Sequence, residues 1–339
     1  MREPREDLRK PGARFDRPSA SGRRRNIPGG AHESGVALVL VLWVLVLLTT
    51  IAMSLVTTTR METTLVGNIR GEREARALVD AGIEFQILQL LVNGESGDDA
   101  EWPADGEFRS WTFADRNIEI RAVPESARID LNAASPELLA GLMGAIGLDE
   151  RQALTLADRI VDWRDRDSDP RPDGAEDQDY NSSGLPYGAK DRKFETVGEL
   201  QQVLGVDRRI YLAAAPALTV HSRRRTVNPI YASRLVLEAI PGMNGEDVES
   251  YLETRSEYTA QDSVLSLPES AEKRYMRAGK GGVYRISARV AFAEGSVSTG
   301  EVVMTRSSNN KRGYKMLESN YIPLGIGDSS TAVRSDQVE

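Results

Sequence analysis

A run of acidic residues in the middle of the chain is the densest candidate for chemistry. Seven carboxylates fall within fifteen positions, and like charges this close repel one another unless a cation neutralises them. They are Asp165, Asp167, Asp169, Asp173, Glu176, Asp177 and Asp179. Because Ca²⁺ accepts ~6 to 8 oxygen ligands in flexible geometry, this spacing predicts a calcium-binding loop.

Three interpretations of this loop are open. Its first acids resemble an EF-hand, but Pro170 stands where that motif needs a glycine, so we expect an irregular calcium loop. The second interpretation is a solvated acidic loop that neighbouring arginines partly neutralise. The third is a hydrolase in which two carboxylates act as acid and base, with Asp167 and Glu176 as the pair.

Cysteine and histidine limit the other kinds of chemistry. The chain has no Cys, which excludes disulfides, thiolate nucleophiles and Cys-containing zinc sites. Its two histidines are His32 and His221, and His32 lies in a basic N-terminal segment. A serine or cysteine triad is hard to build from such a set, so we expect that the protein is not an enzyme.

A long apolar segment predicts one membrane span. From Val36 to Thr59 there are 24 residues without a charge, and ~20 such residues cross the hydrocarbon core as a helix. Three consecutive arginines, 23–25, precede the segment. The positive-inside rule therefore places the N-terminus in the cytoplasm and everything after Arg60 outside.

The helical pattern continues beyond the predicted span. Apolar residues recur at helical spacing until Asn93-Gly94 supplies a stop, and they are Leu78, Ala81, Phe85, Leu88 and Val92. We therefore expect one continuous helix, with residues 36–59 in the membrane and residues 60–93 as its amphipathic extension.

A basic leader, then a glycine, then an apolar helix with an amphipathic extension is the layout of type IV pilins and pseudopilins. The local match is Ser34-Gly35 followed by Val36, and it resembles the K-type minor pseudopilins of type II secretion. The resemblance implies that a prepilin peptidase cuts after Gly35, removes the leader 1–35 and methylates Val36. Leu40 stands where most pilins carry a glutamate, an absence that K-type subunits share.

Alternating apolar and polar residues predict two antiparallel hairpins. The first joins 109–113 to 117–123, the second joins 282–292 to 297–305, and a third short strand is expected at 128–130. The residues between the hairpins are mostly helical in pattern. The predicted fold class is α+β, a pseudopilin-type antiparallel sheet interrupted by a large helical insertion.

These patterns also predict domain boundaries. A discontinuous sheet domain is expected at 105–131 and 280–325, with a helical insertion domain at 132–279 between its halves. A disordered tail is expected at 326–339, and one last strand at 314–322 is an open alternative.

The insertion contains an internal repeat that resembles the helix-hairpin-helix module, at 129–148 and again at 227–243. DNA-binding versions of this module present amides and basic side chains to phosphate. Here acids follow the turns, namely Asp149, Glu150, Glu246 and Asp247. We therefore expect no nucleic acid partner, and a membrane-anchored DNA receptor for uptake is the alternative function.

The resemblance implies a non-enzymatic minor pseudopilin at the tip of the type II secretion pseudopilus, which initiates assembly and supports export across the outer membrane. It places the chain in the inner membrane of a Gram-negative bacterium, with a periplasmic ectodomain that binds calcium. The implied partners are I- and J-type minor pseudopilins, the major pseudopilin below, prepilin peptidase, the inner-membrane assembly platform and the lipid bilayer. After residue 35 the chain has 34 basic and 46 acidic residues, a balance that favours cations.

Overall fold

The computed structural model describes residues 34–92, 101–257, 270–279, 281–292 and 296–326. The chain divides into two units, Met1–Val66 and Gly67–Glu339, and each is described by itself. Of the expected leader, residues 1–33 lie outside the described residues. The same holds for the expected tail from residue 327 onward.

The first element is α1 (Ser34–Val92), one helix of 59 residues. Its segment Ala37–Ser54 is long and apolar enough to cross a membrane, and none of the segment is buried. At 1.5 Å per residue, these 18 residues extend about 27 Å, close to the thickness of a hydrocarbon core. The hydroxyls of Thr49 and Thr50 each donate at 2.8 Å to a carbonyl about one turn back, so they need no solvent partner. The helix is consistent with a single-pass anchor.

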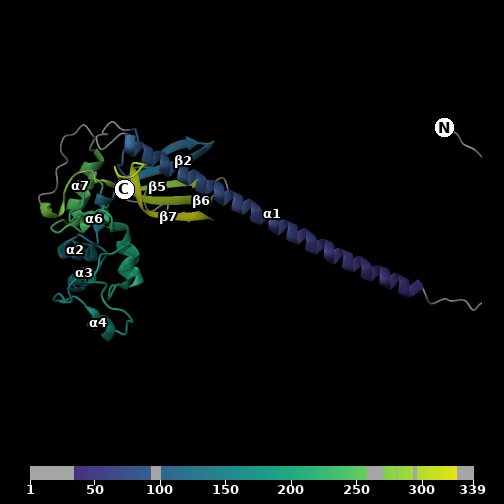
Figure 1. Ribbon diagram of the computed structural model, residues 1–339, viewed down its shortest axis with the longest axis horizontal. Helices are drawn as coiled ribbons and strands as arrows, with labels where there is room; N and C mark the ends of the chain where they lie inside the picture. The colour runs from purple at the N-terminus through teal and green to yellow at the C-terminus, as the bar shows by residue number, and fades with distance from the viewer. Residues whose placement is uncertain (1–33, 93–100, 258–269, 280, 293–295, 327–339) are drawn as a thin grey trace, which may run out of the picture. The chain divides into compact units, whose positions relative to one another are not determined.

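The second unit contains a sheet of five strands in the order β1, β2, β5, β6, β7, and every neighbouring pair is antiparallel (Figure 1). The strands are β1 Arg109–Phe113, β2 Arg116–Pro124, β5 Val283–Ala291, β6 Ser296–Arg306 and β7 Tyr314–Ile326. Both predicted hairpins are confirmed, because β1 pairs with β2 and β5 pairs with β6. The last strand that the sequence left open exists as β7.

Mostly helical chain lies between β2 and β5, which are neighbours in the sheet. Its α-helices are α2 Pro136–Ala145, α3 Glu150–Arg164, α4 Asp177–Ser182, α5 Arg208–Ala214, α6 Arg234–Glu238 and α7 Gly245–Glu257. Its short 3-10 helices are η1 Glu125–Ala127, η2 Val197–Gln202, η3 Ala215–Ala217 and η4 Lys273–Tyr275. The structure therefore belongs to the predicted α+β class.

The predicted third strand does not join the main sheet. It is only two residues long, β3 (Ile129–Asp130), and it pairs in parallel with β4 (Leu218–Thr219) in a separate sheet. The buried carboxylate of Asp130 accepts hydrogen bonds from Asn132 N and Arg223 N, at 2.8 and 2.6 Å. These bonds hold β3 within the loops of the insertion, outside the main sheet.

The helix α1 packs on the sheet through a face that the predicted apolar set matches only in part. Of that set, Leu78 is buried and Phe85 packs against the core, but 56% of Leu88 and 73% of Val92 are exposed. The buried face runs along Ala75, Leu78, Val79, Ile83, Ile87 and Leu90. Gly82 lies on this face, and a Cβ at Gly82 would stand 2.8 Å from Ile118 Cγ2, so the glycine lets helix and sheet approach closely.

The two halves of the predicted internal repeat are both helix–turn–helix units. The turn between α2 and α3 contains Gly147 at φ +93°, and the turn between α6 and α7 contains Gly242 at φ +87°. Asp149 caps α3, since its Oδ1 accepts from Gln152 N at 2.8 Å, and Asn244 caps α7, since its Oδ1 accepts from Asp247 N at 2.9 Å. A Cβ on Gly141 of α2 would lie 2.0 Å from the carbonyl oxygen of Ala239, so the glycine allows α2 to approach the backbone at the end of α6.

A buried ion-pair network joins the insertion to the sheet. Glu125 of η1 is 1% exposed, and its carboxylate accepts from Arg285 Nε of β5 at 2.6 Å and from the Thr219 hydroxyl of β4. Arg285 also donates to Glu301 of β6 and lies 4.0 Å from Glu318 of β7. The strands β5, β6 and β7 are thus connected to η1 and β4 of the insertion through one network of charges and hydrogen bonds.

Candidate metal site

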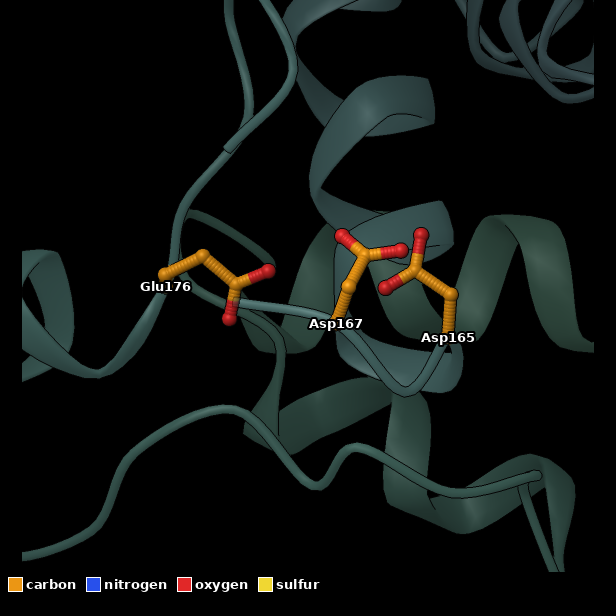
Figure 2. Close-up of side chains that lie close together, drawn as sticks. All are labelled: Asp165, Asp167 and Glu176. Carbon is orange, nitrogen blue, oxygen red and sulfur yellow. The ribbon is translucent and has the colours of Figure 1, made fainter. Parts of the chain in front are cut away.

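Three of the predicted calcium ligands converge after the end of α3. Asp165 is the C-terminal cap of α3, Asp167 follows it in the loop, and Glu176 is the N-terminal cap of α4. One oxygen from each carboxylate lies within 4.8 Å of the others, and Figure 2 shows Asp165 and Asp167 side by side with Glu176 opposite. The loop therefore folds back so that acids nine and eleven positions apart share one space.

Several buried oxygens around this cluster lack a hydrogen-bond donor among the described residues. They are Asp165 Oδ1, Glu176 Oε1, Asp162 Oδ1 and Asp191 Oδ1. Buried carboxylate oxygens are normally satisfied, because an unsatisfied one retains the full penalty of desolvation. Asp162 Oδ1 lies 3.5 Å from Arg171 Nε and so has a cationic neighbour, whereas the other three oxygens indicate a place for a positively charged group.

The electrostatics of the cluster agree with this geometry. Burial, with Asp162, Asp191 and the other cluster acids adding to it, raises the pKa of Glu176 to about 7. Burial, followed by the charge of Asp167, also raises the pKa of Asp165. Each of these carboxylates resists ionisation because the others are close and water is largely excluded.

Asp162 is the ligand candidate that the sequence analysis missed. It belongs to α3, its side chain is fully buried, and its Oδ2 accepts from Arg171 N and Ala175 N at 3.1 and 3.0 Å. These bonds fix the path of the acidic loop around Asp162, and burial raises the pKa of this carboxyl. The available signal was an acid between apolar residues on the buried face of an amphipathic helix. Asp191 lies beyond the acidic run, and its sequence neighbourhood carries no comparable signal.

The other four predicted ligands are not brought into the three-carboxylate cluster. Asp169 and Asp173 are exposed, and the backbone N–H of Asp173 donates to Asp158 at 3.4 Å. Asp179 accepts from Glu176 N at 3.0 Å, so it caps α4. The fourth, Asp177, packs against Gly188, where a Cβ would stand 1.7 Å from Asp177 Oδ1.

The donor set fits a hard divalent cation. Asp165, Asp167 and Glu176 would supply carboxylate oxygens, and the charges of Asp162 and Asp191 also act on Glu176. Ca²⁺ prefers such all-oxygen sets and tolerates irregular geometry, whereas Zn²⁺ prefers nitrogen and sulfur ligands.

The expected processing residues Gly35 and Val36 lie in the first turn of α1, well before the acidic loop in the sequence.

Comparison with known proteins identifies the family. Residues 117–223 match the family model for type II secretion system (T2SS) protein K. Type II secretion system protein K of Pseudomonas aeruginosa is 24% identical over 66% of this chain and 72% of its own. The Aeromonas hydrophila protein of the same name is 25% identical over 68% of this chain and 78% of its own. Over the matched parts, the chain therefore resembles type II secretion system protein K.

The fold of the chain agrees with this resemblance. A solved chain of the GspK-GspI-GspJ complex from enterotoxigenic Escherichia coli superposes with a TM-score of 0.52 at 16% identity, covering 78% of this chain and 99% of that chain. At this level of identity the likeness concerns the fold. The segment that matches the family model runs from β2 to Arg223, so it contains the whole carboxylate cluster. The chain is a minor pseudopilin of the secretion machinery.

Proposed function

We propose that this chain occupies the tip of the type II secretion pseudopilus, where it initiates assembly and supports export across the outer membrane. The observation that carries the proposal is the presence, in one K-family chain, of an exposed apolar helix and of a large insertion between two adjacent strands. The helix supplies a surface for bundling with sibling helices. The insertion supplies bulk that a repeating subunit of a thin fibre could not accommodate.

The apolar helix supports a position with no subunit above it. If the leader is removed after Gly35, Leu40 becomes the fifth residue, and 60% of its surface is exposed on α1. An apolar residue here cannot form the buried ion pair that a glutamate would make with a neighbour's N-terminal amine. The chain can therefore pack sideways against other helices without requiring that contact.

The solved relative is named as a complex with GspI and GspJ, and we infer I- and J-type subunits as partners of this chain. The major pseudopilin would follow below them, and the inner-membrane assembly platform would receive the growing bundle. Prepilin peptidase would cleave after Gly35 and methylate Val36. In this arrangement the N-terminus faces the cytoplasm and the second unit lies in the periplasm of a Gram-negative cell.

Ca²⁺ binding at Asp165, Asp167 and Glu176 is part of the proposal. A bound cation would neutralise the buried charges and tie the end of α3 to the start of α4. The chain has no disulfide available for this purpose, since it contains no Cys. Metal binding would then stabilise the insertion by mass action wherever the free ion exceeds its dissociation constant.

The test of this function is purification of the full-length chain from membranes in detergent, after expression with I- and J-type subunits and prepilin peptidase. We expect a complex with one copy of each subunit, and mass spectrometry of this chain should find a methylated Val36 at its N-terminus. The control is Gly35→Leu, which should keep the leader. A chain that purifies alone, or one that still begins at Met1, would contradict the proposal.

A further inference from the structure

A surface pocket of about 410 Å³ lies beside the N-terminal half of α3 and the start of α5, apart from the carboxylate cluster. Three arginines line it: Arg151 and Arg159 from α3, and Arg209 from α5. Its apolar walls include Leu156 and Ile210. A pocket of this size accommodates the side chains of a short peptide segment or a small ligand.

Positive charge dominates this Arg pocket. Arg151 and Arg159 are eight positions apart, with Thr155 between them, so two turns of α3 bring both guanidinium groups to the same lining. The one acid in the lining is Asp207, whose Oδ1 accepts from Ile210 N at 2.7 Å as the cap of α5. Its carboxylate is thus directed to the backbone.

One arginine of the pocket is held by the backbone, and the other two are exposed. Arg159 Nη1 donates to the Leu204 carbonyl at 3.0 Å, while its buried Nε has no hydrogen-bond partner among the described residues. Gly205 adopts φ +91°, and a Cβ there would stand 2.8 Å from Arg159 Nη1, so the glycine leaves room for the guanidinium group. Within the described part of the chain, Arg151 and Arg209 form no ion pair or hydrogen bond.

Other partly buried arginines of the insertion are used for structure. Arg164 donates to the carbonyls of Leu131 and Ala134, and Arg255 donates to those of Pro229 and Ala232. Such arginines have exchanged water for backbone acceptors and have less donor capacity for a ligand. In the pocket, Arg151 and Arg209 differ because they line the open space with side chains that are exposed and have no protein acceptor among the described residues.

We propose that the Arg pocket binds an acidic peptide segment of a partner protein. Guanidinium groups bind carboxylates through two parallel hydrogen bonds, and three of them can hold two acidic side chains. Leu156 and Ile210 would contact an apolar side chain between those acids. The preferred segment therefore alternates acidic and apolar residues.

Nucleic acid fits this surface less well. A duplex carries one negative charge per ~1.7 Å, so it would lay phosphates over the rim as well as the pocket. Asp149 and Glu150, both exposed, stand at the start of α3, and the chain after residue 35 is acidic as a whole. A peptide can place separate carboxylates in the pocket and avoid these acids.

The experiment is fluorescence anisotropy with the full-length chain in detergent. The probe is a labelled peptide with an Asp-Leu-Asp centre and Gly-Ser flanks, compared with the same peptide carrying Asn-Leu-Asn. We expect the Asp peptide to bind at least about tenfold more tightly, since each charge-assisted hydrogen bond contributes about 1.5–3 kcal/mol. The double variant Arg151→Gln/Arg209→Gln should lose this preference while its melting temperature stays unchanged.

The matched control is Arg208→Gln, an exposed arginine that adjoins Arg209 in sequence but does not line the pocket. This variant should bind the Asp peptide as the unmodified chain does. Equal affinity of the unmodified chain for both peptides, or equal losses in the double variant and in Arg208→Gln, would overturn the proposal. Tighter binding of a labelled DNA duplex that also depends on Arg151 and Arg209 would overturn it in favour of nucleic acid.

Discussion

Glu176 carries a carboxylate that burial and neighbouring acids keep from ionising easily. Its pKa of about 7 means that, without a cation, the folded protein holds a proton there which the unfolded chain has already lost. The stability that protonated Glu176 contributes to the folded protein is fully present below the ordinary glutamate pKa and is lost as the pH rises to about 7. A bound Ca²⁺ would remove this penalty by compensating the charge.

Above pH 7, replacing this residue should have opposite effects with and without metal. Glu176→Gln should raise the unfolding free energy of the calcium-free protein by about 1–3 kcal/mol, because it removes a buried charge. It should also abolish the rise in melting temperature on adding millimolar calcium. Thermal melts with calcium and with chelator measure both effects. Asp173→Asn makes the same charge change at an exposed site and should leave the calcium response intact; an unmodified chain whose melt ignores calcium would refute the metal site.

Glu318 is the opposite case, a carboxyl whose pKa is lowered. A hydrogen bond with His221, whose Nε2 lies 3.0 Å from Glu318 Oε2, lowers that pKa to about 2, with Arg285 adding to the effect against burial. A depressed carboxyl pKa contributes stability that is present above the unfolded-state pKa and is lost as the pH falls through the folded-state value. The joint between β7 and the insertion should therefore weaken in acid.

Glu318→Gln should accordingly destabilise the protein at about pH 6 by about 1–2 kcal/mol, a figure discounted for partial exposure of the carboxylate. At about pH 3 the difference between the two chains should shrink, since the unmodified chain then loses part of the stabilisation that the Glu318 carboxylate provides. Urea unfolding at the two pH values measures this. Glu253→Gln, on the exposed side of α7, serves as control. A destabilisation by Glu318→Gln that is larger at about pH 3 than at about pH 6 would contradict the pairing of Glu318 with His221.

At the scale of elements, sequence periodicity predicted the long helix and the hairpins. It did not predict features that depend on tertiary packing. The alternation at 109–123 and 282–305 was sufficient for both hairpins, because their turns are local. A two-residue strand such as β3 has no periodicity to read. The close contact between α1 and the sheet depends on Gly82, because any side chain at this position would collide with Ile118.

Two alanine substitutions on α1 separate the expected face from the observed one. Ile83 is 4% exposed against the sheet, so Ile83→Ala should lower the unfolding free energy by about 2–4 kcal/mol. Leu88 is 56% exposed, and Leu88→Ala should change it by less than about 0.5 kcal/mol. Urea titrations of both variants provide the comparison. Equal losses, or a larger loss for Leu88→Ala, would contradict the observed packing face of α1.

At the scale of the whole molecule, sequence patterns anticipated a helical interruption of one sheet, because both hairpins needed partners while the intervening residues lacked strand alternation. They placed the acidic loop correctly but could not say which acids would meet. Among the described residues, three of the seven predicted ligands converge, and the charges of Asp162 on α3 and of Asp191 in a later loop act on Glu176. Such convergence depends on tertiary contacts that no local spacing encodes.

The central claim is that one copy of this chain ends the pseudopilus and contacts different subunits through α1. Because the chain has no Cys, Leu40→Cys gives a unique crosslinking position, and Leu154→Cys on the exposed side of α3 is the control. We expect the Leu40→Cys chain, in assembled pseudopili, to crosslink to I- or J-type helices with a cysteine at the matching position, and not to a second copy of itself. A ladder of self-crosslinked species would contradict the account.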